Sequence, residues 1–286
     1  MKARAFSYAR PSTVEEALEA FANAGEDASY IAGGQSLVPA LALRLQAPQV
    51  IIDIAHIPAL RGVKLQDGWL RIGALTRHCE ALTDSLIARH APLFRDAAPY
   101  VAHPAIRNKG TLGGSVALAD PASEFPAMVL AMGAELEIAG LAGVRRVPAD
   151  DYFIDLFQTA IEPGELLVAI HVPVVSPRHR WAFDELARRR GDYAIVGCGI
   201  LADFAGDRIE QIHIVFFSVG STPVRVRAAE AVLTGRDLTQ AAVAEAQARI
   251  ADDLSPPDDE HVPASMRIHL ARVLLGRLLG RMMEAA

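Results

Sequence analysis

"YIAGGQSLVPALALRL", residues 30–45, places a pair of glycines between two apolar runs. A short apolar run enters the pair Gly33-Gly34, and a longer apolar run follows Gln35 and Ser36. The first run predicts a strand, and the second predicts a helix for which Ser36 supplies the N-cap. Adjacent glycines at such a junction let the chain turn sharply or let another group approach the backbone closely.

A second glycine pair recurs further along the chain in "TLGGS", residues 111–115. Both loops lack Cβ atoms at the glycines, so each would present successive backbone N–H groups together with nearby hydroxyls. Such groups bind phosphate, and two loops of this kind could hold both phosphates of a dinucleotide. The alternative is that the two loops are unrelated tight turns.

The common nucleotide-binding fingerprints are missing from the sequence. No G-x-G-x-x-G follows a strand, which excludes the Rossmann pattern, and no G-x-x-x-x-G-K-[ST] occurs, which excludes a P-loop. A dinucleotide would therefore bind through a different fold.

Length and composition predict a protein that binds neither nucleic acid nor metal. The 286 residues suffice for more than one domain, and a net charge of −6 argues against polyanion binding. Cys79 and Cys198 are too few for an iron–sulfur cluster, and the nine histidines show no metal-binding spacing. The low cysteine content favours a reducing, cytoplasmic setting. We expect no secretory signal, because the N-terminal "MKARAFSYARPS" has no apolar core region. We also expect no membrane span, because no apolar run reaches the roughly 18 residues that a span needs.

Three segments follow from the patterns along the chain. Residues 1–56 predict a small βαβ-like unit, whose first helix starts at a capping box of Ser12 and Glu15 and ends at Gly25. Residues 57–176 are rich in strands, with a hairpin at Asp67-Gly68. Residues 177–286 show three strand-like runs and then two helical segments, split by an acidic stretch that contains prolines. Strands followed by helices indicate an α+β fold.

Two further motifs carry polar or aromatic groups. Asp120 and Glu124 are four residues apart and could accept hydrogen bonds from ribose or ribityl hydroxyls, although Asp120 could simply cap a helix. Tyr193, in "RRRGDYAIVG", could cover a flat ring, or it could be a core tyrosine at the end of a basic strand. His103 lies near the second glycine loop in sequence, where a structural role is expected.

"AGGQSLVPALALRL", "IRNKGTLGGSVALADPASEFPA" and "ARRRGDYAIV" together resemble the FAD-binding medium subunits of molybdenum hydroxylases. That family includes the medium subunits of carbon monoxide dehydrogenase and quinoline 2-oxidoreductase, and the flavin domain of xanthine dehydrogenase. The resemblance covers nearly the whole chain. It implies an α+β protein with a two-part, vanillyl-alcohol-oxidase-type (p-cresol methylhydroxylase-like) FAD-binding domain, residues 1–56 and 57–176, and a C-terminal α+β domain, residues 177–286.

The resemblance also implies which residues hold FAD. The residues that would grip the pyrophosphate are Ala32, Gly33, Gly34, Gln35, Ser36, Thr111, Leu112, Gly113, Gly114 and Ser115. Glu124 falls where the family places a carboxylate on the cofactor, and Val101 and Leu167 fall where apolar residues touch the flavin. Asp184 occupies a flavin-contacting position that is lysine in the xanthine enzymes, and Tyr193 would lie against the isoalloxazine ring.

By this resemblance, the chain carries FAD in a complex that also contains a large molybdenum-cofactor subunit and a small [2Fe-2S] subunit, two copies of each. FAD would receive electrons from the iron–sulfur clusters and pass them to an external acceptor, with no catalytic side chain supplied by this chain. Gln35 and Ser115 stand where the carbon monoxide enzymes tend to have His and Asn. The sequence is thus closer to the enzymes of N-heterocyclic and aromatic substrates, and carbon monoxide is the alternative substrate.

Two other functions stay open. A stand-alone flavoprotein reductase of the same superfamily would need a catalytic serine and carboxylate near the flavin, a pair that the sequence does not identify. A non-enzymatic nucleotide-binding or assembly module would use the glycine loops merely as turns.

Overall fold

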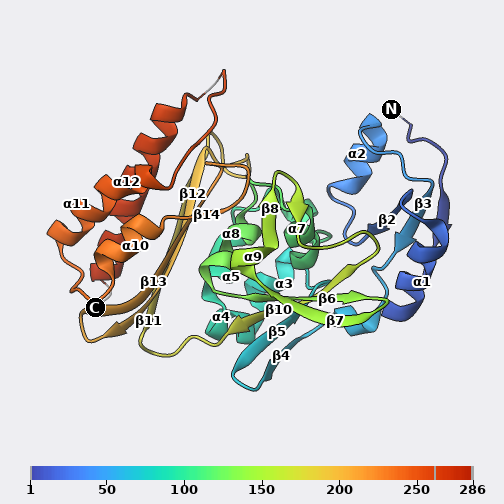
Figure 1. The fold of residues 1–286 in the computed structure, drawn as a ribbon, viewed down its shortest axis with the longest axis horizontal. Helices are drawn as coiled ribbons and strands as arrows, with labels where there is room; N and C mark the ends of the chain where they lie inside the picture. The colour runs from blue at the N-terminus through green and yellow to red at the C-terminus, as the bar shows by residue number, and fades with distance from the viewer. Residues whose placement is uncertain (1, 261, 285–286) are drawn as a thin grey trace.

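The computed structural model describes residues 2–260 and 262–284. Figure 1 shows three layered parts in a row, with the N-terminal part at one end, the C-terminal part at the other and the middle part between them. Each part is built on its own β-sheet. Within the part of the chain that the structure describes, no helix is long and apolar enough to cross a membrane.

The N-terminal part is a three-stranded parallel sheet in the order β1-β3-β2. Helix α1 packs Ala17 and Leu18 against Ile52 of β3. The elements are β1 (Ser7–Ala9), α1 (Val14–Ala24), β2 (Ala28–Ile31), α2 (Leu37–Leu43), β3 (Val50–Asp53) and the 3-10 helix η1 (Pro58–Leu60). The βαβ-like pattern expected from the sequence matches this arrangement.

The capping box of helix α1 differs from the sequence expectation by one residue. The Thr13 hydroxyl accepts the N–H of Glu16, and the Glu16 carboxylate accepts the N–H of Ser12. The expected pair of Ser12 and Glu15 is therefore wrong, because Thr13, whose backbone is extended, is the N-cap of α1. Gly25 ends the helix as expected, with φ of 73°.

The middle part is a five-stranded antiparallel sheet in the order β4-β5-β10-β6-β7, covered by short helices. Asp67 and Gly68 both have positive φ, which confirms the hairpin between β4 and β5. The elements are β4 (Val63–Gln66), β5 (Trp69–Gly73), α3 (His78–Thr83), α4 (Ser85–His90), α5 (Pro92–Ala97), α6 (Pro104–Arg107), α7 (Leu112–Leu118), α8 (Glu124–Ala131), β6 (Glu135–Gly140), β7 (Gly143–Pro148), α9 (Ala149–Tyr152), β8 (Phe153–Asp155), β9 (Gln158–Thr159) and β10 (Leu166–Pro173).

Strand β10 joins the cores of the first two parts. Leu166 and Val168 belong to the hydrophobic cluster of the N-terminal part, whereas Leu167 and Ile170 belong to the cluster of the middle part. Because both faces of the strand are buried, its sequence is a continuous apolar run rather than an alternating one.

The C-terminal part is a four-stranded antiparallel sheet in the order β11-β12-β13-β14, with helices α10, α11 and α12 along one face (Figure 1). The other face packs on the middle part, where Phe183, Val215 and Phe217 share a core with Met128 of α8. The elements are β11 (His179–Leu186), β12 (Val196–Ala205), β13 (Arg208–Phe217), β14 (Val224–Arg225), α10 (Arg227–Leu233), α11 (Gln240–Arg249), η2 (Ile250–Asp252) and α12 (Ala264–Glu284).

The expected number of helical segments at the C-terminal end is wrong by one. The stretch before the acidic segment contains two helices, α10 and α11, because the chain turns at Gly235, whose φ is 78°.

Candidate functional site

The structure brings the two glycine loops together. The loop of residues 32–36 joins β2 to α2, and the loop that leads into α7 runs beside it. A Cβ atom on Gly33 would lie 2.8 Å from the carbonyl carbon of Lys109 and 2.9 Å from the Cα of Gly110. Gly33 is therefore required for the backbone-to-backbone contact between the loops, which fixes their relative position.

The first loop presents backbone donors that nothing else uses. The N–H groups of Gly34, Gln35, Ser36 and Leu37 find no hydrogen-bond acceptor within residues 2–260 and 262–284. Gly34 has a positive φ of 71°, and Ser36 has right-handed helical backbone angles at the start of α2. Ser36 occupies the expected N-cap position of α2, but its side chain makes no capping hydrogen bond. Four adjacent free donors are suited to an anion.

The second loop differs from the first, because its backbone donors are already used. The expectation that it offers a row of free N–H groups is wrong. The four N–H groups of its second half donate as follows: Leu112 to Thr76 O, Gly113 to Ala74 O, Gly114 to Thr111 Oγ1 and Ser115 to Thr111 O. The loop can therefore offer side-chain hydroxyls and a smooth surface rather than N–H groups.

The two glycines of the second loop are needed for different structural reasons. A Cβ atom on Gly113 would lie 2.6 Å from the carbonyl oxygen of Ala74, so helix α7 can only pack there with glycine. Gly114 is exposed, and a Cβ atom on it would meet only Thr111 Oγ1 within 4 Å. Gly113 thus serves packing, whereas Gly114 leaves the open surface of the loop free of a side chain.

Four polar side chains form a second group: Asp120 before α8, Glu124 at the start of α8, Glu185 in β11 and Tyr193 between β11 and β12. Burial, together with the Asp120 carboxylate, raises the pKa of Glu124 to about 7. Desolvation and the charge of the nearby Asp120 carboxylate raise the pKa of Tyr193 to about 12, although most of the Tyr193 surface is exposed. The charge of Glu124 also raises the pKa of Glu185 in β11, so Glu185 is the fourth member of the group. The predicted contacts Glu124 and Tyr193 are therefore neighbours in space.

Glu185 is the residue in this group that the sequence interpretation missed. Its side chain is 9 % exposed, and its Oε2 atom has no hydrogen-bond partner among the residues described. Burial and the charges of Glu124 and Asp184 raise the pKa of Glu185 to about 8. The available signal was the adjacent pair Asp184-Glu185, since successive residues of a strand point to opposite faces.

Asp184 lies on the same strand but has its own partners. It accepts a hydrogen bond from the Tyr100 hydroxyl at 3.4 Å, and its other oxygen pairs with Arg281 of α12 at 2.6 Å. Both carboxylate oxygens are therefore engaged within the protein.

The two predicted apolar contacts are both buried. Val101 is 8 % exposed, and Leu167 is 3 % exposed in strand β10. The segment after Val101 lies against the loop that carries Tyr193, because a Cβ atom on Gly191 would lie 2.9 Å from the carbonyl oxygen of Ala102. His103 lies beside the same glycine, because its Cε1 atom would be 3.0 Å from that Cβ atom, and its structural role stays a prediction.

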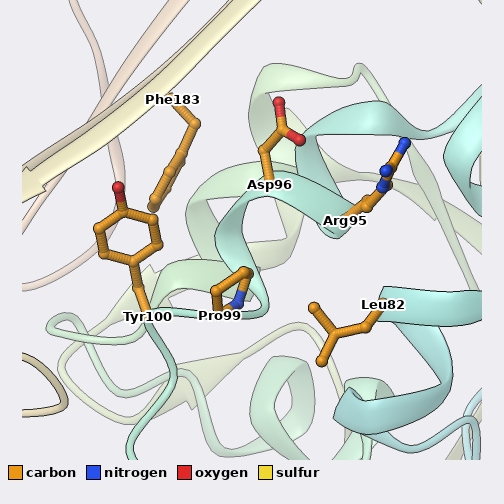
Figure 2. A pocket seen from close by; sticks show the side chains of 6 residues that line it. All are labelled: Leu82, Arg95, Asp96, Pro99, Tyr100 and Phe183. Atoms are coloured by element: carbon orange, nitrogen blue, oxygen red, sulfur yellow. The ribbon is translucent and has the colours of Figure 1, made fainter.

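A shallow pocket of about 480 Å³ lies at the seam between α5 and β11, as Figure 2 shows. It contains none of the predicted site residues. It is lined by Leu82, Arg95, Asp96, Pro99, Tyr100 and Phe183. Throughout the described parts of the chain, no cluster of three His, Cys, Asp or Glu residues could hold a metal ion.

Two family models match the chain and together cover almost all of it. The FAD binding domain in molybdopterin dehydrogenase matches residues 4–175, and the CO dehydrogenase flavoprotein C-terminal domain matches residues 181–282.

Characterised relatives match over the full length. The chain is 38% identical to the 6-hydroxypseudooxynicotine dehydrogenase complex subunit alpha of Paenarthrobacter nicotinovorans, over 100% of this chain and 97% of that protein. It is 35% identical to the carbon monoxide dehydrogenase medium chain of Afipia carboxidovorans, over 96% of each.

Solved structures agree with the sequence comparisons. Carbon monoxide dehydrogenase from Hydrogenophaga pseudoflava superposes with a TM-score of 0.96 at 34% identity, over 99% of both chains. Quinoline 2-oxidoreductase from Pseudomonas putida 86 superposes with a TM-score of 0.94 at 35% identity, over 100% of this chain and 99% of that one. The protein therefore belongs to the family of FAD-binding medium subunits of molybdenum hydroxylases.

Proposed function

We propose that this chain binds FAD and acts as the electron-relaying medium subunit of a molybdenum hydroxylase. The observation that carries the proposal is the row of free N–H groups from Gly34 to Leu37. This row follows Gly33, whose backbone lies against Lys109 and Gly110, the residues directly before the second glycine loop. Family membership supplies the identity of the ligand, and this row of donors fits a pyrophosphate.

We assign the pyrophosphate to the loop of residues 32–36, with Thr111, Gly113, Gly114 and Ser115 forming the opposite wall. The first loop would donate backbone N–H groups, and Ser115 would add a hydroxyl. Gly114 would let the cofactor approach, because no side chain covers that surface. The three segments of the chain, 1–56, 57–176 and 177–286, are proposed as the domains that surround the cofactor.

We assign the flavin to the group around Glu124. Val101 and Leu167 would give apolar contacts, and Tyr193 would lie on the ring. At β11 we favour Glu185 over Asp184, since Glu185 has an unpartnered oxygen whereas Asp184 is bound to Arg281. Glu124 and Glu185, with pKa values of about 7 and about 8, could each hold a proton near neutral pH and donate it in a hydrogen bond.

When bound, FAD supplies the exchange between single-electron donors and a two-electron acceptor. The chain's own residues bind the cofactor, orient it and exclude water from its phosphates. The partners proposed are a large molybdenum-cofactor subunit and a small [2Fe-2S] subunit, because relatives are named as the medium chains or subunits of such complexes. Both cysteines are free, which fits a cytoplasmic setting.

The substrate of the complex is proposed to be an N-heterocyclic or aromatic compound. Relatives named for caffeine and nicotine are 35% and 34% identical to this chain, and the carbon monoxide medium chains are 35% and 34% identical. Because substrate is oxidised on the large subunit in this family, the proposal depends on the Gln35 and Ser115 positions alone.

The visible spectrum of the purified full-length chain tests the function. After incubation with FAD and removal of the excess, we expect flavin absorbance at close to one FAD per chain. A protein that keeps no flavin under these conditions would contradict the proposal and favour an assembly module. A chain that binds FAD and oxidises NADPH without partners would favour a stand-alone reductase.

A further inference from the structure

His78 is a buried side chain next to the second glycine loop, and it has no role in the assignments above. It begins helix α3, 37 residues before Ser115 in sequence, and its side chain is 4 % exposed. Its ring packs on Phe125 with centroids 4.8 Å apart, and its backbone N–H donates to Gly110 O. The ring edge faces Gly110, where a Cβ atom would lie 2.9 Å from His78 Cε1.

The hydrogen bonds of His78 decide which ring nitrogen carries the proton. Burial lowers the pKa of His78 to about 4, so the ring is neutral at pH 7. Its Nε2 lies 3.3 Å from Ser115 Oγ, whereas its Nδ1 has no partner among the described residues. The Thr111 carbonyl, which can only accept, also favours an N–H on the ring. A buried N–H without an acceptor is rarer than a bare acceptor, so the proton belongs on Nε2.

We propose that His78 is a positioning residue for the cofactor: its Nε2–H donates to Ser115 Oγ and thereby leaves the Ser115 O–H free to donate to a phosphate oxygen. If His78 instead accepted the Ser115 proton, the serine could present only lone pairs to an anion. This inference rests on the proposed FAD site, since the Ser115 O–H can donate to a phosphate oxygen only if the cofactor binds there.

A double-mutant cycle on the full-length chain tests the proposal, with FAD affinity measured by titration of flavin fluorescence. The variants are His78→Leu, Ser115→Ala and the pair, with His78→Gln as the conservative variant, since Gln can place an N–H near the same point. We expect His78→Leu to weaken FAD binding about 3- to 10-fold, in line with one lost hydrogen bond, and His78→Gln to stay within about twofold of the wild type. In the Ser115→Ala background, His78→Leu should have no further effect.

His90→Leu is the matched control, because His90 Nδ1 is also unpartnered but lies in α4 outside the loops. It should leave FAD affinity unchanged. If His78→Leu does not give folded protein, as judged by circular dichroism, His78→Asn replaces it, because the Asn amide is too short to reach Ser115 Oγ.

The outcomes separate the two claims. Equal losses from His78→Leu in both backgrounds, or no loss in either, would overturn the positioning role while leaving FAD binding intact. A wild-type chain that binds no FAD would overturn the proposed function, and the role of His78 with it.

Discussion

Single residues in the two loops serve different purposes, although the sequence shows four similar glycines. Gly33 and Gly113 are needed because neighbouring backbone leaves no room for a Cβ atom, whereas Gly114 faces an open surface. Packing and cofactor binding can therefore be separated by mutation, because substitution of a packing glycine should destabilise the FAD-free chain more than substitution of Gly114.

Gly114→Ala should weaken FAD binding by at least about tenfold while lowering the melting temperature of the FAD-free chain by only a few degrees. The new methyl group would occupy the cofactor side of the loop and displace the Thr111 cap, a loss of about 1 kcal/mol. Gly113→Ala, in contrast, should destabilise the FAD-free chain by about 1–3 kcal/mol, because the methyl group meets Ala74. Thermal melts and FAD titrations of both variants check this; equal loss of stability in the two would contradict the distinction.

Glu185→Gln should stabilise the FAD-free chain increasingly as the pH rises. The pKa of Glu185 is about 8 in the folded chain and near 4.5 when unfolded, so the unfolded chain releases this proton first. The wild type therefore loses stability between about pH 4.5 and 8, and glutamine removes that loss. The melting-temperature difference between variant and wild type should grow from pH 5 to pH 8. The exposed Glu19→Gln provides the control, and a difference that is flat with pH would be evidence against a buried, unpartnered Glu185.

At the scale of elements, strand β11 carries two adjacent carboxylates with different partners. Asp184 ties the strand to helix α12 through Arg281, whereas Glu185 lies beside Glu124. Arg281 is more than half exposed, so the Asp184 pair contributes at most about 1 kcal/mol to stability.

Asp184→Asn should therefore leave FAD affinity within about twofold of the wild type, whereas Glu185→Gln should change both the affinity and the reduction potential of the bound flavin. FAD titration and a spectroscopic redox titration on the two variants provide the comparison. A larger change in FAD affinity from Asp184→Asn than from Glu185→Gln would indicate that Asp184, and not Glu185, contacts the flavin.

Local features of several elements could be predicted from the sequence, whereas contacts between distant segments could not. The strand–turn–helix at Gly33-Gly34, the hairpin at Asp67 and the buried run of β10 follow from local pattern, and the structure has all three. The hydrogen bonds that the N–H groups of Leu112 and Gly113 donate could not be predicted, because the acceptors are carbonyl groups of a distant segment, those of Thr76 and Ala74. The position of His78 beside the second glycine loop could not be predicted for the same reason, because its hydrogen bond with Ser115 joins residues that are distant in the sequence.

Glu185 was missed through the geometry of β11 rather than through distance in the sequence. A strand that is buried on both faces has no polar–apolar alternation to show which of two adjacent acids faces the site. The one-residue error at Thr13 has a similar origin, because Ser12 and Thr13 are both suitable N-caps and only the backbone geometry decides between them.

At the scale of the whole molecule, the middle part shares buried cores with both of its neighbours. Strand β10 contributes to the core of the N-terminal part, and Phe183 and Phe217 of the C-terminal sheet join the core of the middle part. The loops and the Glu124 group are therefore held by continuous packing rather than by flexible linkers.

Purification from the native source should yield this chain together with a larger and a smaller subunit. Metal analysis of that complex should find molybdenum and iron, whereas the described residues of this chain contain no group of three or more His, Cys, Asp or Glu side chains placed to hold a metal ion. Recovery of an active complex without either metal would contradict the assignment to this family of complexes.

Amide hydrogen exchange measured by NMR shows whether the free N–H groups of the first glycine loop hold the FAD pyrophosphate. With FAD bound, exchange at Gly34, Gln35, Ser36 and Leu37 should slow by at least about tenfold, because each of these groups gains an acceptor. Exchange at Leu112 and Gly113 should change far less, since both are already hydrogen-bonded. Unchanged exchange at residues 34–37 in a chain with FAD bound would contradict the account.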